Sequence, residues 1–119
     1  NHDTLVTLDS AEFNAAVDRV SLISRAGDYN VIKMEFTQGQ LHITSNNPDI
    51  GNAEETIPAS IEGPDVTIAF NAQYITDVMK IIDSKNCELR LTKPLAPMTV
   101  REEKDDAFIY VVTPVRTTH

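Results

Sequence analysis

Apolar residues in this chain recur with two different periods, and the order of these periods constrains the fold more than any other feature. In residues 10–24, four apolar side chains are spaced three or four positions apart, as on one face of a helix: Phe13, Ala16, Val17 and Val20. In residues 31–45, apolar and polar residues alternate on both sides of Gln38-Gly39, which is typical of two strands joined by a tight turn. We expect a loop at residues 46–51.

A second amphipathic segment lies in the later half of the chain. Before it, a weak and acidic strand over residues 52–61 carries Pro58, which lacks a backbone donor and favours an edge position or a bulge. A strand at residues 66–70 then leads into a helix over residues 71–82, with Asn71 as the expected N-cap. The expected apolar face of this helix consists of Tyr74, Ile75, Val78, Ile81 and Ile82.

The same order of elements therefore occurs twice. A strand at residues 4–9 precedes the first helix, which Asp9 or Ser10 caps, and further strands follow the second helix at residues 87–92, 98–100 and 108–115. The result is β-α-β-β-β, repeated. We predict a single α+β domain over residues 1–119, with two helices packed on one face of mostly antiparallel sheet.

Charge and cysteine content narrow the function classes. The formal net charge of −8 and the pI of about 4.7 argue against a domain that grips nucleic-acid phosphates tightly by itself, but leave room for a local basic face. No apolar run approaches the roughly 20 residues that span a membrane. The single cysteine, Cys87, cannot form an internal disulfide, so we expect a cytoplasmic protein without membrane contact.

The residues that enzymes use are present but scattered. His2, His42 and His119 lack the spacing of a metal site, and no glycine-rich phosphate loop is found. Cys87 has no histidine near it in sequence and is interpreted as a small buried hydrophobic residue, while Asp105-Asp106 lies in a charged turn. We therefore expect no enzyme, no cofactor and no metal.

Four segments carry a family resemblance. In chain order they are LHITSNNPDIGNAEETI, FNAQYITDVMKII, LTKPLAPMTV and YVVTPVR, and together they resemble the C-terminal domain of the bacterial sliding clamp, the β subunit of the replicative DNA polymerase. The resemblance implies the third domain of a longer, non-catalytic chain. Two such chains close as a homodimer into a ring around duplex DNA, with helices lining the hole. The ring acts as a processivity factor and holds DNA without sequence preference.

The resemblance also implies a peptide-binding pocket at the chain end. The family docks linear motifs of the polymerase α subunit, the clamp loader and repair polymerases in an apolar groove, where Arg116 would bond a peptide carbonyl or carboxylate. The matching positions are Asn71, Tyr74, Leu95, Pro97, Val111, Val112, Thr113, Pro114, Val115 and Arg116. Without the resemblance, Val111 and Val112 would be interpreted as ordinary strand core. The family usually has methionine at the positions of Thr113 and Val115, so a narrower or differently selective pocket is expected.

Two further surfaces follow from the same resemblance. Leu22 and Ile23 match the family's apolar dimer contact, and the acidic residues Asp49, Glu54 and Glu55 would face basic groups across that interface. The alternatives are a helix end packed within the domain and a solvated strand edge. Residues expected to face DNA are Arg19, Arg25, Lys80 and Lys85; the alternative is that they are ordinary surface charges.

Two other functions stay open at this point. A stand-alone peptide-binding module would have the same groove without a ring or a role on DNA. A small enzyme would need a catalytic constellation, and none is recognisable in the sequence.

Overall fold

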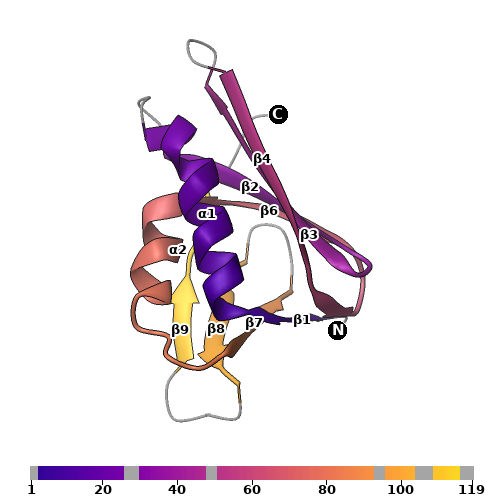
Figure 1. The fold of residues 1–119 in the computed structure, drawn as a ribbon. Helices are drawn as coiled ribbons and strands as arrows, with labels where there is room; N and C mark the ends of the chain where they lie inside the picture. The colour runs from indigo at the N-terminus through magenta and orange to yellow at the C-terminus, as the bar shows by residue number, and fades with distance from the viewer. Residues whose placement is uncertain (1–2, 26–29, 48–50, 93–95, 104–108, 116–119) are drawn as a thin grey trace.

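The computed structural model describes residues 3–25, 30–47, 51–92, 96–103 and 109–115, with side chains described up to Ile23 in the first of these ranges. Figure 1 shows the arrangement of the elements. They are β1 (Thr4–Asp9), α1 (Ser10–Arg25), β2 (Val31–Thr37), β3 (Gln40–Asn47), β4 (Gly51–Pro58), β5 (Ser60–Glu62), β6 (Val66–Asn71), α2 (Ala72–Met79), β7 (Asn86–Leu91), β8 (Met98–Glu102) and β9 (Ile109–Val112).

The strands form two antiparallel sheets, and the first strand of each half of the chain pairs in the sheet of the other half. The five-stranded sheet has the order β5-β1-β7-β8-β9, and the four-stranded sheet has the order β4-β3-β2-β6. Strand β1 pairs with β5 and with β7 of the second half, and β6 pairs with β2 of the first half. The predicted repeat of β-α-β-β-β is present, but its halves interlock, because the first strand of each half pairs in the sheet of the other.

One predicted strand proved to be two. The segment over residues 52–61 divides at Ala59 into β4 and β5, which belong to different sheets. The division follows from Pro58, which lacks a donor, and from the Ala59 amide, which donates to the Gly39 carbonyl oxygen at 3.1 Å instead of continuing a ladder. The prediction of an edge position for Pro58 is confirmed, because β4 lies at the edge of its sheet.

Both helices lie on the same side of the fold, as predicted. Helix α1 packs on β2, β3 and β4, while α2 contacts α1, β6 and β9 (Figure 1). The predicted apolar face of α1 is confirmed, since its side chains are completely buried: Phe13, Ala16, Val17 and Val20. They pack into a single core with the inward-facing residues of both sheets.

The apolar face predicted for α2 was partly wrong. The buried residues of this helix are Ala72, Ile75 and Met79, which share one face at spacings of three and four. Tyr74 is exposed because it lies off this face of the helix, and Ile81 is exposed beyond the helix end at Met79. The prediction for Asn71 is confirmed: its side-chain oxygen accepts a hydrogen bond from the Gln73 amide at 2.9 Å.

Two local expectations are refined. At the start of α1, the Asp9 carboxylate accepts a hydrogen bond from the Glu12 amide at 2.9 Å, so Asp9 rather than Ser10 caps the helix. The loop predicted at residues 46–51 begins later, because Asn46 and Asn47 continue β3. Asn47 is buried, and its Nδ2 donates to the Ile23 carbonyl oxygen at 3.4 Å.

Candidate functional site

The chain end leaves one sheet and joins the other. Strand β9 ends at Val112, and the three described residues that follow it have no regular structure. The Val115 amide donates to the Ala69 carbonyl oxygen on β6 at 2.8 Å. Pairing with β8 stops at Val112, and Pro114, two residues later, has no amide hydrogen with which to resume it. The end of β9, the end of β6 and the start of α2 therefore meet, since α2 also contacts β9.

Most described residues of the predicted pocket lie around this junction. Asn71 and Tyr74 are contributed by the end of β6 and the first turns of α2, and the Tyr74 side chain is 54% exposed. Pro97 is exposed and precedes Met98, which pairs with Val112. Leu95 and Arg116 lie outside the described residues, so the structure does not place them.

The two neighbouring valines of β9 have opposite environments. Val112 is only 3% exposed and belongs to the core. This agrees with the alternative interpretation of Val112 as an ordinary core residue of a strand. Val111 is 63% exposed and faces outward beside Thr99, its cross-strand neighbour on β8. The alternation of side chains along a strand separates them. Thr113 is exposed, while Pro114 and Val115 are half-buried.

The expected dimer contact is exposed at the end of α1. Leu22 is 60% exposed, whereas Ile23 is half-buried. Leu22 therefore does not pack within the domain as a helix-end staple would. Asp49 lies outside the described residues.

The acidic edge is divided between the two faces of β4. Glu55 faces α1 and accepts a hydrogen bond at 2.8 Å from the Arg19 guanidinium. Glu54 lies on the other face, with a carboxylate oxygen 3.9 Å from His42 Nε2. His42 Nδ1 is in turn 2.7 Å from the Thr56 hydroxyl. The period of two along a strand places consecutive residues on opposite faces, so Glu54 and Glu55 do not form one acidic surface.

The Arg19–Glu55 pair joins a residue expected to face DNA to one expected at the dimer interface. The hydrogen bond from Arg19 lowers the pKa of the Glu55 carboxyl, and the same contact raises the pKa of Arg19. The charge of Arg19 is therefore compensated within the domain. Both side chains are accessible to solvent, so the pair adds little to stability.

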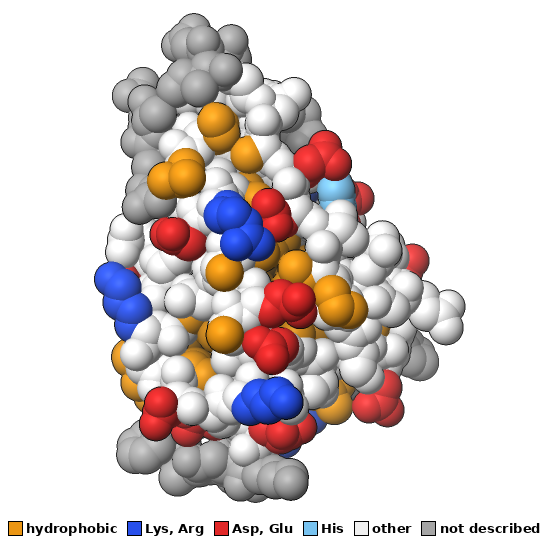
Figure 2. All heavy atoms as spheres, viewed as in Figure 1, with side chains coloured by type: hydrophobic (Ala, Val, Ile, Leu, Met, Phe, Trp, Pro, Cys, Tyr) orange, Lys and Arg blue, Asp and Glu red, His pale blue; other side chains and the backbone are white. Residues whose placement is uncertain are grey.

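The face that carries the helices is not uniformly positive. Lys80 directly follows α2, and both Lys80 and Lys85 are exposed. The Arg25 side chain lies outside the described part. Figure 2 shows that the basic and acidic side chains described on this face are interspersed. Contact with phosphates there would be loose and dependent on salt.

Cys87 is a core residue, as predicted. Its side chain is fully buried, and burial raises the pKa of its thiol to about 11. Among the described residues, no three His, Cys, Asp or Glu side chains gather where they could hold a metal ion. No helix in the described ranges is long and apolar enough to cross a membrane.

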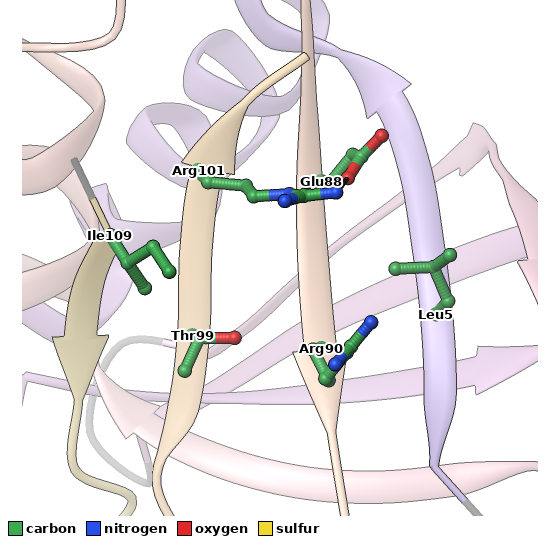
Figure 3. A pocket seen from close by; sticks show the side chains of 6 residues that line it. All are labelled: Leu5, Glu88, Arg90, Thr99, Arg101 and Ile109. Carbon is green, nitrogen blue, oxygen red and sulfur yellow. Dashed lines mark hydrogen bonds and ion pairs between the residues drawn. The ribbon is translucent and has the colours of Figure 1, made fainter. Parts of the chain in front are cut away.

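One surface feature was missed by sequence reasoning. A hollow of about 190 Å³ lies on the outer face of the five-stranded sheet, lined by Leu5, Glu88, Arg90, Thr99, Arg101 and Ile109 (Figure 3). The alternation of outward-facing residues along each strand was visible in the sequence. The pairing that brings residues of β1, β7, β8 and β9 side by side was not.

Comparisons with known proteins agree with the fold. Residues 1–116 match the family model described as the DNA polymerase III beta subunit, C-terminal domain. A beta sliding clamp of Staphylococcus aureus is 32% identical over 118 residues, which is 98% of this chain and 31% of the relative. The chain thus spans about a third of the length of the curated relatives that it matches.

Solved structures are similar over the same extent. The DNA polymerase sliding clamp of Bacillus subtilis matches with a TM-score of 0.93 and 32% identity, covering 98% of this chain and 31% of the clamp. The DNA polymerase III beta subunit of Thermotoga maritima matches with a TM-score of 0.93 and 27% identity, covering 96% and 31%. The match to the family model extends over nearly the entire chain, and this protein therefore belongs to the family of C-terminal domains of the DNA polymerase III beta subunit.

Proposed function

We propose that this domain is one part of a DNA replication processivity factor, a sliding clamp that is not itself an enzyme. The observation that carries the proposal is the match of residues 1–116 to the third clamp domain, together with a fold that agrees along the whole chain. Since the chain spans 31% of its relatives, a full clamp chain would contribute two more domains. Two such chains would close as a homodimer into a cytoplasmic ring around duplex DNA.

The ring would hold DNA by topology rather than by tight contact. The net charge of −8 and the compensation of Arg19 by Glu55 both support a loose, non-specific interaction. Lys80, Lys85 and Arg25 would supply the remaining attraction from the helix face. Leu22 would bury its exposed side chain against the other chain, and Ile23, Asp49 and Glu54 would contribute to the same interface.

The chain end would dock linear motifs of polymerases, the clamp loader and other DNA-processing proteins. Tyr74 and Thr113 are exposed at the junction of α2 and the chain end, where a peptide would find both apolar surface and backbone groups. Burying one leucine or phenylalanine of the peptide would contribute about 1.5–3 kcal/mol. Arg116 and Leu95 would complete the groove.

A peptide titration tests this proposal. The ¹⁵N-labelled chain is titrated with Gln-Leu-Asp-Leu-Phe, and amide shifts are expected at Tyr74, Val111 and Val115. Tyr74→Ala should weaken binding about tenfold, because it removes the largest exposed apolar side chain of the site. Ile81→Ala is the matched control: Ile81 is equally exposed just beyond α2 but lies outside the proposed groove. Equal losses in both variants, or shifts elsewhere on the domain, would refute the assignment.

The alternative of a stand-alone peptide-binding module is not favoured, since the relatives are sliding clamps. It predicts the same peptide binding but no retention on circular DNA.

A further inference from the structure

The outer face of the five-stranded sheet is organised in two rows that run across its strands. Cross-strand register places Leu5, Arg90, Thr99 and Val111 in one row, on β1, β7, β8 and β9. The neighbouring row consists of Thr7, Glu88, Arg101 and Ile109 on the same strands. Directly opposite residues in an antiparallel sheet share a face, so all of these side chains point away from the core.

The hollow of about 190 Å³ lies over these two rows. Arg101 reaches from β8 to Glu88 on β7, with its Nε at 2.7 Å and its Nη2 at 2.6 Å from one carboxylate oxygen (Figure 3). This pair holds the Arg101 side chain across the floor. Arg90 lies beside it and is exposed, and it makes no ion pair with any described residue. Leu5 on β1 and Ile109 on β9 line its two apolar sides.

The charge of the hollow is opposite to that of the chain. Among the described residues that line it, two arginines accompany one glutamate, whereas the chain carries a net charge of −8. The next acidic residue of the Arg90 row is Glu62, two strands away beyond Leu5, or about 10 Å at the usual strand spacing. An exposed arginine is well suited to binding a carboxylate, and Leu5, directly opposite Arg90 on β1, offers apolar contact.

The hollow is also continuous with the proposed peptide groove. Val111 ends the row that contains Arg90 and Thr99, and it is among the residues assigned to the groove. Its side chain is exposed toward this same outer face. A peptide held at the chain end would therefore reach the hollow by extending across β9 and β8.

We propose that this outer face is a second part of the peptide-docking surface, and that it takes an acidic residue flanking the linear motif of a protein partner. The carboxylate would bind Arg90, while Leu5, directly opposite Arg90 on β1, would contact the aliphatic stem of that residue. This inference rests on the proposed function, because the motif itself would be held at the chain end.

The test compares acidic and neutral extensions of one peptide. Gln-Leu-Asp-Leu-Phe is extended by Glu-Glu or by Gln-Gln, at either its N-terminal or its C-terminal end, and the dissociation constants for the 119-residue chain are measured. At least one Glu-Glu peptide should bind about fivefold more tightly than its Gln-Gln counterpart, with additional amide shifts at Thr99 and Ile109. Arg90→Gln should abolish this difference without changing the affinity for the unextended peptide. Arg90→Lys, which keeps the charge, should retain most of it.

The outcomes separate this inference from the proposed function. If the unextended peptide binds but both Glu-Glu peptides match their Gln-Gln counterparts, the inference is overturned and the groove stands. A difference that persists in Arg90→Gln overturns it as well, because the charge would then act elsewhere. Self-association that Arg90→Gln abolishes would identify a second copy as the occupant and would also overturn it. If no peptide binds, both proposals fail.

Discussion

The opposite environments of Val111 and Val112 make a sharp prediction about β9. Val112→Ala removes two buried carbon groups, which costs about 1.6 kcal/mol of transfer free energy at roughly 0.8 kcal/mol for each group. The cavity left behind raises the expected loss of unfolding free energy to about 2 kcal/mol. Val111→Ala makes the same chemical change on a side chain that is 63% exposed, so its loss should stay below about 0.5 kcal/mol.

Urea unfolding followed by far-ultraviolet circular dichroism measures both losses, because the chain contains no tryptophan for a fluorescence assay. The peptide affinity should respond in the opposite order. Val111→Ala should weaken the binding of Gln-Leu-Asp-Leu-Phe about fourfold, and Val112→Ala should weaken it less. Equal losses of stability, or a larger loss for Val111→Ala, would refute the orientation of β9 and with it the continuity between the groove and the outer face.

Three further predictions concern stability and reactivity. Gly63→Ala should destabilise the domain by more than about 1 kcal/mol, because Gly63 has a φ of +120° and an added Cβ would lie 2.5 Å from the Asp3 carbonyl oxygen. Gly39 has a φ of +84° but open space around it, so Gly39→Ala should cost less unfolding free energy in the same urea experiment. The reverse order would contradict the packing of Gly63. Cys87 should resist alkylation at pH 8 until the protein unfolds, and rapid alkylation of the native protein would contradict its burial. The pKa of its thiol is raised from 9.0 to about 11 in the folded state, so its contribution to stability should be complete below pH 9 and be lost as the pH rises toward 11. The pKa of the Glu55 carboxyl is lowered in the folded state, so its small contribution to stability is present above the ordinary pKa of 4.5 and is lost as the pH falls through the lower folded value. Glu55→Gln should therefore flatten the acid limb of a curve of stability against pH. An unchanged limb would argue against the Arg19 contact.

Local signals predicted much of the fold. The buried face of α1, the hairpin turn at Gln38-Gly39 and the cap at Asn71 each depend on residues within a few positions of one another. Such features are set by short-range sterics and hydrogen bonding, which the sequence displays directly. The apolar pattern did not predict the exposure of Tyr74, because the buried face of α2 consists of Ala72, Ile75 and Met79, and Tyr74 lies off this face.

Non-local pairing explains what the sequence could not predict. The exchange of β1 and β6 between the sheets, and the division of one strand at Ala59, depend on partners far away in the chain. The strand predicted at residues 52–61 already implied that Glu54 and Glu55 lie on opposite faces, but only the packing of β4 under α1 decides which of the two faces is covered. The row that contains Arg90 is assembled from four strands, so no single segment reveals it.

Retention on circular DNA tests the central claim most directly. The full-length protein that carries this domain is incubated with clamp loader and nicked circular DNA, and the protein that stays with the DNA is measured before and after a single cut linearises it. A ring that holds DNA by topology should remain on the circle at high salt and be released when the circle is cut, because a linear molecule has ends from which a ring can slide. Equal retention on circular and linear DNA, or no retention on either, would contradict the account of this domain as part of a sliding clamp.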